Sequence, residues 1–243
     1  MQKYTFKEHF IELKNRLFKM VIFFILSFSV CYFFKEYIYD FFLEPLSELN
    51  KDGQRRIIYT GLAEAFFSYI KLSIFSAFCL TIPIICYQLY AFIAPGLKPP
   101  ERKIIAGVFA LSPFLFYIGS FFVFYFVMPR AWDFFLSYEG GDTVLPLVME
   151  ARISEYLSFV MQLTWAFGIA FQLPIVMIIL TVIGLINANT LKKKRRVSVV
   201  IIFIIAAIFT PPDVISQIAL AIPLLLLYEL SIILCNLVEK RRS

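Results

Sequence analysis

Residues 66–95 read FFSYIKLSIFSAFCLTIPIICYQLYAFIAP, an apolar run that contains a single charged residue, Lys71. A helix over this run would be about 45 Å long, whereas the hydrocarbon core of a bilayer is about 30 Å thick. Such a helix has to tilt, protrude or bend, and Pro83 offers a position for a bend. Lys71 lies near the start, where its side chain can reach the membrane surface. The run therefore predicts a membrane-spanning helix.

Five more apolar segments flank this run and predict further spans. They cover residues of about 17–34, 104–128, 156–186, 197–209 and 214–237. The fifth span, residues 197–209, would rise only about 20 Å as a helix, which is less than the thickness of the hydrocarbon core. A short span beside longer ones favours a recessed, concave wall. We therefore predict an all-α, polytopic membrane protein with one domain over residues 1–243, six spans, and short fifth and sixth helices.

The composition agrees with a membrane protein and argues against a soluble one. Of the 243 residues, 60% are hydrophobic and 16% are charged, whereas soluble domains carry about 45–50% apolar and about 25% charged residues. The net charge of +6 comes from short basic runs beside apolar segments, a pattern that encodes membrane orientation and not nucleic-acid binding. The four cysteines lie in or beside apolar segments without a C-x-x-C pair, so we expect small buried side chains.

The basic residues also predict the orientation of the chain. Sixteen of the 23 Lys and Arg residues fall in the N-terminal segment, the second and fourth loops and the C-terminal tail, and six fall in the intervening loops. Loops rich in Lys and Arg remain in the cytoplasm. Both termini are therefore predicted to be cytoplasmic, which agrees with an even number of spans.

The sequence does not favour an enzyme. His9 is the only histidine, so a Ser/His pair or a histidine-rich metal site within the membrane cannot be built. The chain has no H-E-x-x-H, G-x-S-x-G or P-loop motif. We expect no catalytic residues, no metal and no cofactor.

Two acidic residues stand out on the side that is otherwise basic. Glu12 precedes the first span and could form an ordinary ion pair with Arg16 one helical turn later. Glu101 follows Pro99 and Pro100 and could be an acidic residue at the start of a helix. Both carboxylates could instead bind a cationic ligand, and residue chemistry alone leaves these alternatives open.

Three polar residues fall within the predicted spans: Gln172, Gln217 and Glu229. Polar side chains in a membrane usually face the protein interior and often have a function. For the two glutamines, hydrogen bonding between helices is the structural alternative. Glu229 requires an ionic partner, water or a neutral state, and the sequence does not identify which.

Several motifs, in the same order along six spans, resemble one known family. HFIELKNR at 9–16 is similar to H-L-x-E-L-R-x-R, and YQLYAFIAPGL at 87–97, followed by Glu101 and Arg102, is similar to Y-Q-x-W-x-F-x-A-P-x-L…E-R. Further similarities are SF at 158–159, AFG at 166–168, FQLP at 171–174, TPPD at 210–213 and SQ at 216–217. Along essentially its whole length the chain resembles TatC, the multi-span receptor of the twin-arginine protein translocase.

The resemblance implies a receptor in the bacterial inner membrane that binds the twin-arginine signal peptides of folded proteins at the cytoplasmic face. It assigns this binding to Glu12, Glu101 and nearby Phe92, and we expect His9 and Arg16 of the first motif to take part in it. It implies transport driven by the proton-motive force, with single-span TatA- and TatB-type partners, membrane lipids and further copies of the chain. The expected partner contacts and intramembrane polar positions are Gln172, Thr210, Asp213, Gln217 and Glu229.

Two positions depart from the family pattern. Lys14 replaces an arginine of the first motif, and Gln172 stands where many members have a glutamate within the membrane. A role that needs a titratable carboxylate at position 172 is therefore not expected here. An amide both donates and accepts, so a role in hydrogen bonding remains possible.

A secondary transporter for a small solute is the alternative function. Such transporters usually contain inverted repeats and broken helices that converge at the middle of the membrane. The sequence shows no internal repeat. Pro83, Pro174 and Pro223 could nevertheless break spans, so the alternative remains open.

Overall fold

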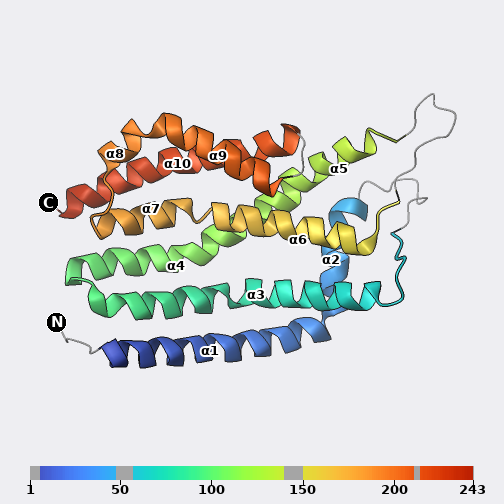
Figure 1. The fold of residues 1–243 in the computed structure, drawn as a ribbon, viewed down its shortest axis with the longest axis horizontal. Helices are drawn as coiled ribbons and strands as arrows, with labels where there is room; N and C mark the ends of the chain where they lie inside the picture. Colours follow the sequence, from blue (N-terminus) through green and yellow to red (C-terminus); the bar gives the residue numbers. More distant parts are fainter. Residues whose placement is uncertain (1–5, 48–56, 140–149, 211–213, 243) are drawn as a thin grey trace.

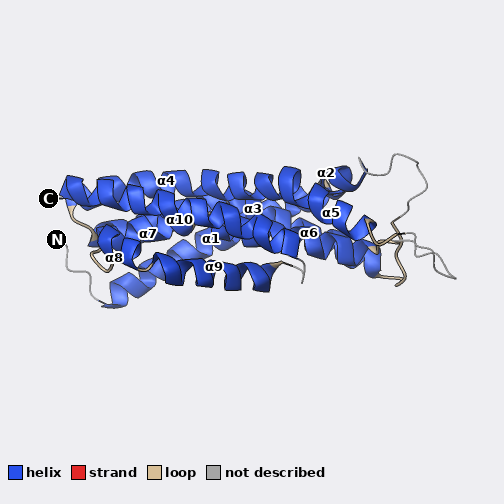
Figure 2. Cartoon of the chain, turned by 90° about the horizontal axis from the view of Figure 1, so that it is seen from above, coloured by secondary structure: helices blue, strands red, loops and turns tan. Residues whose placement is uncertain are grey.

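The computed structural model describes residues 6–47, 57–139, 150–210 and 214–242. The long helices lie side by side along the longest axis of the molecule (Figure 1). Figure 2 shows them from above as one elongated bundle. In chain order the elements are α1 (Phe6–Phe33), α2 (Lys35–Ser47), α3 (Glu64–Ile93), the 3-10 turn η1 (Ala94–Gly96), α4 (Pro99–Phe122), the π-helical turn η2 (Val123–Val127), α5 (Met128–Leu136), α6 (Ile153–Ala170), α7 (Leu173–Val182), α8 (Ala188–Lys193), α9 (Arg195–Phe209) and α10 (Val214–Arg242).

Five segments in the described part of the chain are long and apolar enough to cross a membrane. They are Lys7–Phe33, Glu64–Gly96, Pro99–Leu136, Ile153–Val182 and Gln217–Lys240. Each contains most of one predicted span. The predicted fifth span lies in α9, whose 15 residues make it shorter than the other five. The all-α membrane fold is therefore confirmed.

The prediction of a short sixth helix is wrong. The last helix, α10, has 29 residues and continues past the apolar segment through Glu239 and Lys240. Hydropathy locates the end of an apolar run, but backbone hydrogen bonding can continue through charged residues at the membrane surface.

Three short helices lie where the sequence predicted polar stretches or loops. The helix α2 follows α1 directly, α5 continues α4 through η2, and α8 precedes α9. One predicted span, residues 156–186, consists of two helices, α6 and α7. Pro174 has no N–H and its ring displaces the carbonyl four residues earlier, so the helix is interrupted at Phe171 and Gln172.

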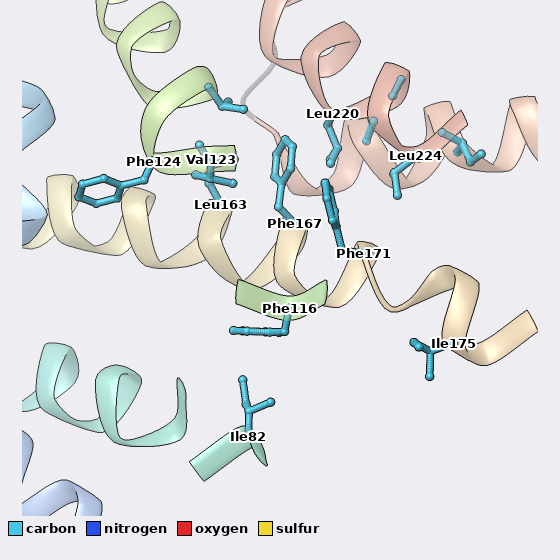
Figure 3. Packing of buried hydrophobic residues seen from close by; sticks show 14 of the residues in the cluster. Ile82, Phe116, Val123, Phe124, Leu163, Phe167, Phe171, Ile175, Leu220 and Leu224 are labelled. Atoms are coloured by element: carbon cyan, nitrogen blue, oxygen red, sulfur yellow. The ribbon is translucent and has the colours of Figure 1, made fainter. Parts of the chain in front are cut away.

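The helices α4 and α6 approach each other at two glycines. A Cβ on Gly168 would lie 2.4 Å from the ring of Phe116, and a Cβ on Gly119 would lie 2.8 Å from the carbonyl oxygen of Phe167. On the other side of α6, Phe167 and Phe171 point toward Leu220 and Leu224 of α10 (Figure 3). The glycines thus bring α4 close to one side of α6, while aromatic side chains on its other side and just after its C-terminal end face α10.

At the end of the bundle away from the N-terminus, Glu64 joins α3 to the start of α6. Its carboxylate accepts hydrogen bonds from the backbone N–H groups of Thr60 (2.9 Å) and Gly61 (3.1 Å). It also accepts from the Ser154 hydroxyl (2.6 Å) and lies 3.7 Å from the Arg152 guanidinium. Next to it, an isolated backbone bridge pairs Ile58 with Arg152. We call this arrangement the Glu64 clasp.

The Glu64 clasp predicts a selective effect on stability. The Glu64→Ala variant removes the acceptor of the bonds from Thr60, Gly61 and Ser154. It should lower the unfolding temperature in detergent, because several hydrogen bonds that join α3 to the start of α6 are lost together. Glu155→Ala is the matched control, since Glu155 pairs with the same Arg152 (3.2 Å) but is 70% exposed. We expect its effect to remain within about 0.5 kcal/mol. Equal effects of the two substitutions would contradict the clasp.

Candidate functional site

An ion pair on α1 forms the centre of a candidate site at the end of the bundle where α1 starts. Arg16 donates through Nε and Nη2 to Oε1 of Glu12, at 3.0 and 2.5 Å. The same guanidinium reaches α3, where Nη1 donates to Oε1 of Gln88 (3.3 Å) and Nη2 to the carbonyl oxygen of Ala91 (3.0 Å). The Glu12 and Arg16 side chains are each 22% exposed. The pair therefore binds α1 to the last turns of α3.

The predicted residues His9 and Phe92 lie against each other beside this pair. Their rings are stacked, with centroids 4.3 Å apart and an interplanar angle of 18°. Nδ1 of His9 lies 4.0 Å from Oε2 of Glu12. The structure thus brings together four of the five residues that the sequence analysis assigned to peptide binding: His9, Glu12, Arg16 and Phe92.

The fifth residue, Glu101, lies at the start of α4 because two prolines begin that helix. Pro99 and Pro100 occupy its first turn, where a missing N–H has no cost. The Glu101 carboxylate accepts a hydrogen bond from the backbone N–H of Lys98 (3.2 Å). The structural alternative, an acidic residue at a helix N-terminus, is therefore realised. This turn is at the same end of the bundle as the N-terminus of α1 (Figure 1).

A pocket of about 490 Å³ opens between these elements. Its wall includes Glu12 and Arg16 of α1, Tyr87 and Tyr90 of α3, and Arg102 of α4. Glu101 precedes Arg102 in the chain and does not line the pocket. The pocket therefore offers aromatic surface, one carboxylate and two guanidinium groups to a ligand that arrives at this end.

Within the bundle, Gln172 forms hydrogen bonds between helices. The Ser112 hydroxyl donates to Oε1 of Gln172 (2.6 Å), and Nε2 of Gln172 donates to the carbonyl oxygen of Ser112 (3.0 Å). The Cys86 thiol donates to the same Ser112 hydroxyl (3.4 Å). This series joins α3, α4 and the break between α6 and α7, so Gln172 has the structural role that the sequence analysis allowed.

The remaining polar candidates lie on α9 and α10. Nε2 of Gln217 donates to the carbonyl oxygen of Phe203 on α9 (3.2 Å). Thr210 follows the last residue of α9, is 6% exposed, and donates from its hydroxyl to the carbonyl oxygen of Ala206. Asp213 lies outside the described residues.

Glu229 has the ionic partner that the sequence could not identify. Arg195, at the first position of α9, donates from Nη2 to Oε2 of Glu229 at 2.6 Å. Both side chains are about half exposed, at 52% and 49%. The pair joins α9 to the middle of α10.

Comparison with known proteins identifies the family. The family model for Sec-independent protein translocase protein (TatC) matches residues 8–223. The chain belongs to the TatC family. A TatC protein from Rickettsia prowazekii is 59% identical over 243 residues, which cover all of this chain and 97% of the relative. A TatC protein from Escherichia coli is 37% identical over 224 residues, which cover 92% of this chain and 85% of the relative.

Solved TatC structures share the fold. A crystal structure of the twin-arginine translocase receptor TatC in a detergent has a TM-score of 0.79 and 35% sequence identity, with 94% of this chain and 99% of that chain covered. The chain is therefore a TatC-family subunit of the Sec-independent protein translocase, a membrane-embedded transport component that belongs to a complex with other Tat components.

Two groups in the site were not predicted from the sequence. Gln88 lies in the quoted motif but had no assigned role, and Ala91 contributes only its backbone carbonyl. A signal for Ala91 was present, since Pro95 stands four residues later and has no N–H to donate to that carbonyl. The spatial register between α1 and α3, which brings Arg16 to both groups, cannot be read from either helix alone.

Proposed function

We propose that this chain is the receptor that recognises twin-arginine signal peptides at the end of the bundle formed by α1 and the turn between α3 and α4. The observation that carries the proposal is the partly buried Glu12 carboxylate on the wall of an open pocket, with Glu101 at the same end of the bundle. Carboxylates here suit a ligand with two guanidinium groups, because each carboxylate can accept two parallel N–H bonds. Export of folded proteins by the proton-motive force fits the family.

We infer a cytoplasmic location for this end. The start of α1 and the end of α10 lie there in Figure 1. Most Lys and Arg residues of the sequence fall in the N-terminal segment, the second and fourth loops and the C-terminal tail, which are the segments predicted to be cytoplasmic. This arrangement requires that α9 cross as a sixth span despite its 15 residues, with local thinning of the bilayer. A membrane-impermeant thiol reagent should label a cysteine at position 243 in inverted vesicles but not in intact cells, and labelling in intact cells would exclude this topology.

We also propose that single-span TatA- and TatB-type proteins and further copies of the chain assemble with it. The exposed surfaces of α9 and α10 are the proposed contact, with Gln217 partly exposed on α10 and the Arg195–Glu229 pair half exposed. Polar groups at helix surfaces in a membrane favour helix association. A photo-crosslinker at Gln217 in native membranes should capture a single-span partner, and the absence of such a product would rule out this contact.

Binding of a labelled signal peptide to the detergent-solubilised chain tests the receptor function. We expect an Arg-Arg peptide to bind at least about tenfold more tightly than the Lys-Lys peptide, because lysine cannot form the bidentate pair. Glu101→Gln should reduce this preference, and Glu139→Gln, at the opposite end of the bundle, should not. Equal binding of both peptides to the unmodified chain would exclude the proposed function.

A further inference from the structure

Three acceptor groups converge on the guanidinium of Arg16. They are the Glu12 carboxylate, the side-chain amide oxygen of Gln88 and the backbone carbonyl of Ala91. Each of the three guanidinium nitrogens has at least one of these acceptors at 3.3 Å or less. We call the three acceptors the guanidinium cradle.

The local sequence explains why the carbonyl of Ala91 is available to a side chain. In a helix this oxygen would accept from the N–H of residue 95, but that residue is proline. The bond from the N–H of Ala94 to the carbonyl of Tyr90, one residue earlier in the series, is the one that ends α3. Gln88 is only 7% exposed, and its amide oxygen points at the same guanidinium. The carbonyl of Ala91 is thus held by the helix backbone, and the buried side chain of Gln88 adds a second acceptor from the same helix.

The cradle fits a guanidinium better than an ammonium. A guanidinium presents five N–H donors in a rigid plane, which allows it to reach three separate acceptors at once. A lysine carries its donors on one nitrogen atom, so it cannot reproduce the spacing between Nε, Nη1 and Nη2. The same geometry that holds Arg16 would thus distinguish arginine from lysine in a ligand.

The charges around the adjacent pocket are unfavourable for a cationic ligand that binds while Arg16 stays in the cradle. The charged residues on its wall are one carboxylate, Glu12, and two guanidinium groups, Arg16 and Arg102. The wall is therefore net positive while Arg16 lies in the cradle, and a peptide with two arginines would be repelled at short range. Departure of Arg16 from the cradle would both remove one positive charge and expose the acceptors.

We propose that the guanidinium cradle is a binding subsite for one arginine of the signal peptide, and that Arg16 occupies it until the peptide arginine displaces it. This inference rests on the proposed receptor function. Arg16 is then an internal competitor, and Gln88 and the Ala91 carbonyl are specificity-determining groups that act beside Glu12. The apparent dissociation constant rises by the reciprocal of the fraction of molecules in which the cradle is open.

We call the displacement of Arg16 by a peptide arginine the exchange, and substitution of Arg16 tests it. Arg16→Gln should tighten binding of the Arg-Arg peptide to the full detergent-solubilised chain by about threefold to tenfold, if Arg16 fills the cradle in about 70–90% of molecules. The gain should disappear in the double variant with Glu12→Gln. If Arg16 instead only positions Glu12, Arg16→Gln will weaken binding or leave it unchanged, and either result overturns the exchange.

Substitution of Gln88 provides a second test that retains the ion pair on α1. Gln88→Leu should weaken binding of the Arg-Arg peptide by about threefold to tenfold and leave Lys-Lys binding unchanged. This loss corresponds to one charge-assisted hydrogen bond that is partly screened by water. Gln162→Leu, an exposed glutamine on α6, is the control and should alter neither. An equal loss for both peptides would indicate a structural role and overturn the proposal.

These outcomes separate the exchange from the receptor function itself. If the unmodified chain shows no preference for Arg-Arg over Lys-Lys, the receptor function fails. If that preference is present but Arg16→Gln does not tighten binding, only the exchange fails. Unfolding temperature and size-exclusion profile are measured for each variant, and if Arg16→Gln does not fold, the peptide ratio in Gln88→Leu decides.

Discussion

Replacement of Gly168 with leucine should prevent α4 and α6 from packing, whereas the same replacement at Gly107 should leave the fold intact. A Cβ at position 168 would lie 2.4–2.7 Å from three ring carbons of Phe116. Phe116 is 3% exposed and packs edge-on against Trp165 at a centroid distance of 5.9 Å, so its ring has little room to move. Even the first added carbon therefore forces the two helices apart.

The expected loss of stability is large compared with the total. One to a few extra methylene groups in a packed core cost about 1–3 kcal/mol, and leucine adds four carbons at a backbone-to-ring contact. A typical folding free energy is about 5–15 kcal/mol. We therefore expect Gly168→Leu to yield little monodisperse protein in mild detergent and to lower the unfolding temperature of the remainder.

Gly107 provides the matched control because it lies in α4, where an added Cβ would meet nothing within 4 Å. Leucine there should even favour the helix, since glycine costs about 1 kcal/mol relative to good helix formers. Both variants are purified in the same detergent and compared by size-exclusion chromatography and thermal unfolding. Similar profiles for the two variants would show that α4 and α6 do not approach as closely as described.

Hydropathy predicted the helical membrane fold because a long apolar run has few other stable states in a bilayer. It did not predict α2, since Lys35, Glu36 and Asp40 make that segment read as a polar loop. Hydropathy also does not predict the close contact at Gly168. The effect of a glycine depends on which side chain faces it, and here that side chain comes from α4.

The part of the site that lies within a single sequence motif was predictable. The first motif contains His9, Glu12 and Arg16, and their spacing of three and four residues places them on one helix face. Their partners Phe92 and Gln88 lie more than 70 residues later in the chain. The family resemblance supplied Phe92, but no sequence pattern indicated that Arg16 would fill a cradle made by α3.

Glu12→Gln should cause the largest functional loss among substitutions that preserve the fold. If Glu12 pairs with a peptide arginine, the change removes one charged partner, and charge-assisted hydrogen bonds contribute about 1.5–3 kcal/mol each. The carboxylate is only 22% exposed, so water screens the pair less than at an open surface. We expect Arg-Arg peptide affinity to fall about tenfold to a hundredfold and export of a folded reporter in cells to fall strongly.

The glutamine at position 12 should retain the local structure, because its amide oxygen can still accept from Arg16 and hold α1 against α3. Glu8→Gln is the control, since it removes the same charge from an exposed position one turn earlier on α1. A general electrostatic attraction between an acidic surface and a cationic peptide would make the two variants lose affinity equally. A direct pair with Glu12 predicts a much larger loss for Glu12→Gln, together with a weaker preference for Arg-Arg over Lys-Lys, because only the direct pair distinguishes a planar guanidinium from an ammonium.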